Sequence, residues 1–317
     1  MTSASVHNFQ ASWNEQNVSL NPKATICRSI LSKMKNILFY LPNSLIATCI
    51  NPRNATQFSL YENSFFFSRS FSRQIITPDH VPLQARIDTI RGSNEETPTV
   101  ILFNPLGTND GIYNQFRITL LKKHCNVVSF DHRGLGTTWR TKDLVLDGDS
   151  VYQFVTKELK ISTAKVHFFG HSLGGAIAAQ VKSLHPESLG KYVGDRTFAS
   201  FFSLITEKCC IARFGYIIKI VSSLFARILI AFPLFLLGWD FNTKEAFEKM
   251  QGKRLTIIHP NDFLIPSLAS AAQYKSRRIT LDPSIKGPTT HFASIDEQRT
   301  EKKQEASILV ADFLAKD

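Results

Sequence analysis

The chain has 317 residues, of which 43% are hydrophobic, and its formal net charge is +11. This composition excludes an intrinsically disordered chain and allows one large core or two smaller ones. The lysines and arginines are dispersed, without zinc-finger spacing, an RNP-like aromatic motif or a dense basic run, so the sequence predicts no nucleic-acid partner. It favours solubility or attraction to an anionic membrane surface as the use of the charge.

The number and spacing of the cysteines indicate the redox state of the compartment. There are five, an odd number without C-x-x-C spacing, which argues against a disulfide framework and against structural zinc. We therefore expect a reducing compartment, no cofactor and no metal, in a protein that is cytoplasmic or peripheral to a membrane. Residues 1–20 are polar and nearly uncharged, which is unlike a secretory signal peptide.

The first part of the chain differs from the rest. Residues 1–69 lack regular strand alternation, and we expect a partly irregular N-terminal extension there. Residues 74–77 and 81–90 flank the turn residues Pro78, Asp79 and His80, which predicts a hairpin.

Strand-like and helix-like runs alternate after the hairpin. This order predicts right-handed βαβ units. The expected fold class is α/β over residues 70–317, with a mostly parallel central sheet flanked by helices. Strands are expected at 99–103, 126–130 and 166–169, and helices at 112–123, 150–159 and 172–184.

The alternation continues with a short strand at 191–195 and then breaks over about 197–242, where we expect a helical cap insertion. Within it, residues 214–237 are predominantly apolar and long enough to cross a membrane. Lys219 and Arg227 interrupt this run, and interior charges are costly in lipid, so the sequence favours a cap over a membrane anchor. Alternation then resumes, with a helix from about 243, a strand at 254–259, a helix after 266, a strand at 278–281 and a final helix near 295–315.

Residues 165–175 carry the first catalytic candidate. They read KVHFFGHSLGG, an apolar strand followed by a G-x-S-x-G turn at the start of a helix-forming run. Such a turn holds its serine in a strained conformation above the sheet, and the small residues Gly170, Gly174 and Gly175 make room for it. We therefore predict that Ser172 is a nucleophile.

A serine hydroxyl needs a base, and only three histidines follow Ser172. His185 lies about one helix beyond the serine and is expected at the surface, and His259 closes an apolar strand, where a packed histidine is the common case. His291 follows the last expected strand, in a loop before the last helix. We predict that His291 is the base.

An orienting carboxylate is expected between the serine and the histidine in the chain. Asp262 stands three residues past the strand at 254–259, in a loop suited to this role. Asp195, at the end of the preceding strand, is the alternative that stays open. A loop aspartate is most often a cap or turn residue, and Asp282 and Asp240 fit that description better.

An oxyanion needs two donors. The backbone N–H of Leu173, next after the serine, is one candidate. The loop after the strand at 99–103 reads NPLG, where Pro105 has no N–H, so Leu106 is the second candidate. The same residues also suit an ordinary turn. The sequence DHRGLG at 131–136 is interpreted as structural support.

With these residues in order, the chain from about residue 74 onward resembles the α/β-hydrolase superfamily, in its serine esterase and lipase branch. More narrowly, NPLG at 104–107, GDRTFAS at 194–200 and GWD at 238–240 resemble the Chlamydia CHLPS-type hydrolase-like proteins. This narrower group has distant similarity to membrane-associated mammalian lipid hydrolases.

The resemblance implies a serine hydrolase that acts on a carboxylic ester or thioester, through an acyl-enzyme on Ser172 with Asp262 and His291. The apolar insertion and basic charge favour a lipid or other small-molecule ester as substrate and an anionic membrane surface as partner. Two alternatives stay open: an acyltransferase that uses the same residues, and a catalytically silent protein that uses the fold to bind membranes or partners.

Overall fold

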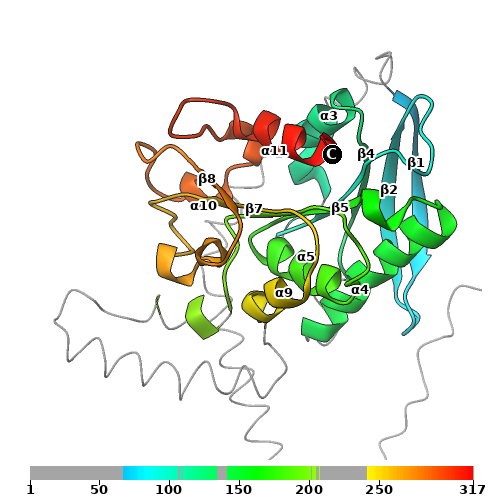
Figure 1. Cartoon of the computed structure of the whole chain (residues 1–317), viewed down its shortest axis with the longest axis horizontal. Helices are drawn as coiled ribbons and strands as arrows, with labels where there is room; N and C mark the ends of the chain where they lie inside the picture. The colour runs from blue at the N-terminus through cyan, green and yellow to red at the C-terminus, as the bar shows by residue number, and fades with distance from the viewer. Residues whose placement is uncertain are drawn as a thin grey trace, which may run out of the picture. The chain divides into compact units, whose positions relative to one another are not determined.

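The computed structural model describes residues 67–105, 108, 110–133, 141–200, 202–204, 207 and 241–316. All of them lie in the second of the two units into which the chain divides, Gln57–Asp317. They form one eight-stranded sheet in the order β1-β2-β4-β3-β5-β6-β7-β8 (Figure 1). The strands are β1 (Phe67–Ile76), β2 (Pro82–Ile90), β3 (Thr99–Phe103), β4 (Asn126–Phe130), β5 (Val166–His171), β6 (Tyr192–Asp195), β7 (Arg254–Ile258) and β8 (Arg277–Thr280).

The sheet is mostly parallel. Only β1 with β2 and β2 with β4 pair antiparallel, whereas the five pairs from β4 to β8 are parallel. Parallel strands that are covered on both faces read as continuous apolar runs, because both sets of alternating side chains are buried. Strands β3, β4 and β5 have this character, and every one of their residues is buried.

Helices cover both faces of the sheet. Helices α4 (Thr141–Gln153), α5 (Leu173–Ser183) and α9 (Thr243–Lys249) pack together on one face, and α3 (Asn114–Lys122) and α11 (Ala306–Ala315) pack on the other (Figure 1). Alternate residues of β5 point to the two faces of the sheet: Phe168 packs in the core on one face, and Phe169 packs in the core on the other. The sheet thus separates two hydrophobic cores.

Short helical turns complete the described chain. These are η2 (Asp110–Tyr113), the π-helical turn η3 (Phe154–Glu158), η4 (Thr163–Lys165), η7 (Ser267–Ala269), η8 (Ala271–Gln273), α10 (Thr289–Phe292) and η9 (Ile295–Glu297). Several of them lie at the same edge of the sheet as the carboxyl ends of the parallel strands, where ligands bind in open α/β sheets.

The predicted fold class is confirmed, and the expected strands are present within a few residues of their predicted ends, except that β1 begins seven residues before the expected hairpin strand at 74–77. Three helix predictions were wrong in extent. Helix α4 begins at residue 141, nine residues before the expected start, and the helix expected after 266 is only two short 3₁₀ turns. The expected final helix is divided into η9 and α11 by an irregular stretch at 298–305.

Some predicted features fall outside the described residues. These are nearly all of the extension at 1–69, residue Leu106, and the 208–240 part of the cap insertion with its apolar run at 214–237. Strand β1 begins at Phe67, inside the stretch assigned to the extension. In the parts of the chain that the structure describes, no helix combines the length and apolarity that a membrane crossing requires.

Candidate active site

Ser172 lies on a sharp turn between β5 and α5. Its backbone has φ 53° and ψ −119°, a conformation that is strained for a residue with a side chain. The neighbouring glycines are needed for close approach, because a Cβ on Gly170 would lie 2.4 Å from the backbone of Gly174, and a Cβ on Gly174 would lie 2.1 Å from the carbonyl oxygen of Phe103. This is the crowding that the G-x-S-x-G pattern predicts for a nucleophile elbow.

The structure brings Ser172, His291 and Asp262 together. His291 Nε2 lies 3.0 Å from Ser172 Oγ, and His291 Nδ1 lies 3.1 Å from Asp262 Oδ2 and 3.0 Å from Oδ1. Ser172 lies in the turn before α5, and Asp262 lies in the loop after β7. His291 belongs to α10, a four-residue helix where the sequence predicts a loop. A carboxylate beside Nδ1 keeps the proton there, which leaves Nε2 as the acceptor that faces the serine.

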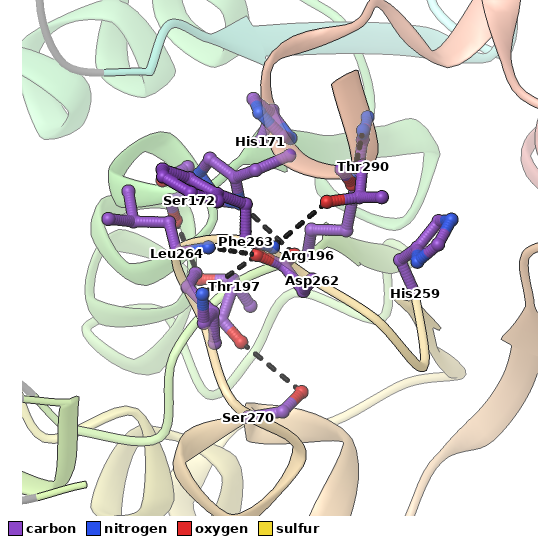
Figure 2. A network of polar contacts seen from close by, with 12 residues as sticks. His171, Ser172, Arg196, Thr197, His259, Asp262, Phe263, Leu264, Ser270 and Thr290 are labelled. Carbon is purple, nitrogen blue, oxygen red and sulfur yellow. Dashed lines mark hydrogen bonds and ion pairs between the residues drawn. The ribbon is translucent and has the colours of Figure 1, made fainter. Parts of the chain in front are cut away.

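Asp262 also orders its own loop. Its Oδ1 accepts hydrogen bonds from the N–H groups of Leu264 at 2.8 Å and Ile265 at 2.7 Å, as the turn-residue interpretation of a loop aspartate expects (Figure 2). The carboxylate therefore has two sets of partners, the backbone of its loop and the imidazole of His291. These bonds fix the direction in which the carboxylate points before any substrate binds.

The other two histidines have different partners. His259 is buried, and its Nδ1 accepts a hydrogen bond from the N–H of Asn261 at 3.1 Å. Figure 2 shows His259 and Ser172 on opposite sides of Asp262. His185 is half-buried, and its Nε2 lies 2.6 Å from Asp149 Oδ1. His291 is thus the histidine that contacts Ser172.

Asp195, the alternative acid, contacts a different histidine. Its Oδ2 lies 3.0 Å from His171 Nδ1 and 2.7 Å from Arg196 Nη2. Burial by itself would raise the pKa of Asp195, but the charge of Arg196 and the hydrogen bonds from His171 and Arg196 outweigh it and hold the pKa well below its usual range. Burial and then the Arg196 charge lower the pKa of His171 to about 4, so this imidazole is neutral at physiological pH.

The predicted oxyanion donors are only partly described. Leu173 is the first residue of α5, so its N–H has no acceptor within the helix. Leu106 lies outside the described residues. The strand before it is anchored at its end, because the Asn104 side chain donates to the carbonyl of Phe130 at 2.9 Å.

Three residues beside the site were given no catalytic role from the sequence, although Arg196 and Thr197 lie in the GDRTFAS motif at 194–200. The Tyr113 hydroxyl donates to the carbonyl of Phe103 at 2.8 Å and accepts from the N–H of His171 at 3.3 Å. Thr197 Oγ1 donates to the carbonyl of Ser172 at 2.7 Å, and Arg196 is 1% exposed beside Asp195. A charged pair directly after an apolar strand is a signal for Arg196, whereas Tyr113 has no local signal.

Comparisons with known proteins address the fold. Residues 98–208 match a family model described as alpha/beta hydrolase fold. The protein WAV2 of Arabidopsis thaliana, named for its alpha/beta hydrolase domain, is 25% identical over 111 residues, 34% of this chain and 36% of WAV2. RutD of Serratia proteamaculans, named as a proposed carbamate hydrolase, is 30% identical over 148 residues, 45% of this chain and 52% of RutD. The matches thus span about half or less of these curated relatives.

A solved structure extends the likeness over most of the chain. The esterase Pf2001 of Pyrococcus furiosus superposes with a TM-score of 0.53 and 18% identity, over 79% of this chain and 91% of that chain. At this identity the likeness establishes the fold and not the activity. The chain therefore has the alpha/beta hydrolase fold, and its residues 98–208 match the family model for that fold.

Proposed function

We propose that this protein is a serine hydrolase that cleaves a carboxylic ester or thioester through Ser172, His291 and Asp262. The observation that carries the proposal is the continuous contact from Ser172 Oγ to His291 Nε2 at 3.0 Å and from His291 Nδ1 to Asp262 at 3.0 Å. Its sequence order, serine then acid then histidine, is the order of this fold. The esterase and hydrolase names among the relatives agree with the proposal.

The proposed reaction has two halves. Ser172 Oγ attacks the substrate's carbonyl carbon while its proton passes to His291 Nε2, and Asp262 stabilises the imidazolium. The carbon–oxygen or carbon–sulfur bond then breaks, and the leaving alcohol or thiol takes that proton. Water adds to the acyl-enzyme in the same way and releases the acid and the serine. The Leu173 N–H, and the Leu106 N–H as expected from the sequence, stabilise the oxyanion.

Two aromatic side chains support an apolar substrate. Phe263 and Phe292 directly follow Asp262 and His291, and they are 44% and 39% exposed. Their ring centroids lie 6.4 Å apart, and the Phe292 ring meets the His291 ring edge-on at 5.3 Å. Exposed aromatic rings beside a polar site favour an apolar group in the ligand. We propose a lipid-like or other acyl ester, to be checked with p-nitrophenyl esters from acetate to dodecanoate, where preference for acetate would contradict the lipid part.

The serine assignment is tested by labelling. Wild-type protein is expected to react with a fluorophosphonate probe and to hydrolyse p-nitrophenyl butyrate, and Ser172→Ala is expected to lose both, with a fall in turnover of several orders of magnitude. Ser188→Ala is the matched control, because its buried hydroxyl binds the carbonyl of Thr163, away from the site. A Ser172→Ala protein with more than about a tenth of wild-type turnover would exclude Ser172 as the nucleophile.

The same assay separates the alternative functions. A catalytically silent protein takes up no probe although it is folded. An acyltransferase takes up the probe but transfers its acyl group to an added alcohol, so that a new ester forms in place of the free acid. An aryl carbamate is included among the substrates, because its carbonyl undergoes the same attack and RutD is named for carbamates.

We also propose peripheral contact with an anionic lipid surface, supported by the net charge of +11 and by the apolar sequence at 214–237. Sedimentation with anionic vesicles is expected to exceed that with zwitterionic ones. It is expected to weaken with salt, because salt at roughly 0.1 M screens the attraction between exposed charges that are more than about 10 Å apart. Substituting Leu229→Glu and Leu236→Glu should reduce it. Equal, negligible sedimentation in all conditions would contradict the membrane part. The narrower likeness to the Chlamydia CHLPS-type proteins stays a prediction from the sequence motifs.

A further inference from the structure

Arg196 is a buried arginine directly after β6. It is 1% exposed, and its φ of +45° is unusual for a residue with a long side chain. Its Nε and Nη2 donate to the two oxygens of Asp195 at 2.9 and 2.7 Å. Because this carboxylate neutralises the guanidinium, the remaining donors are available for other acceptors without an unpaired charge in the interior.

Those donors reach the short helix that carries His291. Arg196 Nη1 donates to the carbonyl of Thr290 at 3.3 Å, and Nη2 donates to the carbonyl of Ala293 at 2.9 Å. The two carbonyls lie on either side of His291 in the chain. Helix α10 has four residues, too few to be stable by its own hydrogen bonds, so its position depends on such tertiary contacts.

The segment at the end of β6 that contains Arg196 also holds Ser172. The carbonyl of Asp195 accepts a hydrogen bond from the N–H of Ser172 at 2.9 Å, and Thr197 Oγ1 donates to the Ser172 carbonyl at 2.7 Å. We call residues 195, 196 and 197 the β6 bridge. Its backbone and threonine fix the serine, and its arginine fixes the turn of the histidine, so one rigid strand end carries both partners of the 3.0 Å contact.

Arginine suits this role better than lysine. The guanidinium is planar and presents donors in fixed directions, so that one edge binds a carboxylate while other N–H groups reach two backbone carbonyls. A lysine ammonium is a compact charge on a flexible chain and does not reproduce this geometry. The contacts at 2.7–3.3 Å therefore depend on the shape of the side chain as well as on its charge.

We propose that Arg196 is a positioning residue for the hydrolase reaction, which holds His291 Nε2 in line with Ser172 Oγ without touching the substrate. The inference rests on the proposed function. Displacement of a reacting group by about 1 Å costs about 10²-fold in rate. Loss of the guanidinium contacts therefore lowers kcat, whereas KM stays the same because the substrate's binding surface is unchanged.

The test compares Arg196→Lys with wild type by steady-state hydrolysis of p-nitrophenyl butyrate and by the rate of fluorophosphonate labelling. We expect kcat and the labelling rate to fall about 10²-fold, with KM within about twofold. Arg117→Lys is the matched control. Arg117 is 2% exposed and its Nε lies 3.2 Å from Asp88, so it is an equally buried, paired arginine, and it belongs to α3.

A second variant covers the case that Arg196→Lys does not fold. The double substitution Asp195→Asn with Arg196→Gln removes both charges together, so no unpaired buried charge remains. It is expected to fold, as judged by circular dichroism and thermal unfolding, and to show the same selective loss of kcat. The proposal is overturned if a folded Arg196 variant keeps kcat within about threefold, or if Arg117→Lys loses as much kcat at a matched Tm. A wild-type protein that does not label would instead contradict the proposed function.

Discussion

Asp262 and Asp195 follow neighbouring strands of one sheet, yet their carboxylates bind different histidines. Asp262 faces His291 at 3.0 Å, and Asp195 faces His171 at 3.0 Å and pairs with Arg196. The carboxylate of Asp195 is neutralised by the charge of Arg196, and it does not contact His291. The division of partners assigns the two aspartates different roles in the proposed mechanism.

The first prediction separates these roles. Asp262→Asn is expected to lower turnover by roughly 10⁴-fold, because an amide does not fix the imidazole tautomer that accepts the serine proton. Asp195→Asn is expected to cost at most about 10²-fold in the folded protein, since Asp195 acts on His291 through Arg196 and the position of the turn. Both are measured as kcat on a p-nitrophenyl ester with folded protein. The reverse ranking would transfer the acid role to Asp195.

The sequence predicted the residues that meet at this site better than the residues that support them. Ser172, Asp262 and His291 were identified because each stands at a recognisable place after a strand. The contacts of Arg196 and Tyr113 were not predicted, because their partners are distant in sequence. Arg196 binds the carbonyl of residue 290, 94 positions later, and the Tyr113 hydroxyl accepts from the N–H of residue 171, 58 positions later. No local pattern records such a contact.

At the scale of elements, the position of Ser172 depends on how closely α5 approaches β3. They approach closely at Gly174, where a Cβ would lie 2.1 Å from the Phe103 carbonyl oxygen. Gly174→Ala is therefore expected to lower the free energy of unfolding by about 3 kcal/mol and to reduce activity, because backbone must move to admit the methyl group.

The control for this prediction is Gly92→Ala. Gly92 has φ +75°, and a Cβ added to it would meet nothing within 4 Å, so only its backbone conformation opposes alanine, at about 1 kcal/mol. Urea unfolding of both variants gives the comparison. If Gly174→Ala unfolded at the same urea concentration as Gly92→Ala, the close approach of α5 to β3 would not limit stability.

The elements also differ in how well the sequence predicts them. Strands β3 and β4 match their predicted bounds, because each is a short, fully buried apolar run between polar residues. The start of α4 was missed, since its first turns carry the polar residues Thr141, Lys142 and Asp143. Helix α10 has four residues, about one turn, which is too short to show the repeated apolar spacing from which a helix is predicted.

At the scale of the whole molecule, stability depends on pH through a buried carboxyl group. Asp296 Oδ1 is buried without a hydrogen-bond partner among the described residues, and burial raises the pKa of Asp296 from 3.8 to about 6. A carboxyl group whose folded pKa is raised binds its proton more tightly in the folded state. Its contribution to stability is therefore fully present below about pH 4 and is lost as the pH rises through about 6.

Asp296→Asn removes this titration. The wild type is expected to lose about 2 kcal/mol of stability relative to the variant between pH 4 and pH 7. Urea unfolding at pH 4, 5.5 and 7 measures the difference. Asp312→Asn is the control of opposite sign, because Lys123 at 2.6 Å lowers the pKa of Asp312. A gap between wild type and Asp296→Asn that did not change with pH would contradict the prediction.

The order of the described sheet leaves β1 and β8 as its two outer strands. An outer strand presents unpaired backbone groups, which invite a second copy of the chain to add by edge-to-edge aggregation. Arg69 and Arg73 are exposed on β1, and Arg277 is exposed on β8. Two copies that met at these edges would bring like charges together, so part of the positive charge of this protein protects it from self-association during folding and at high concentration.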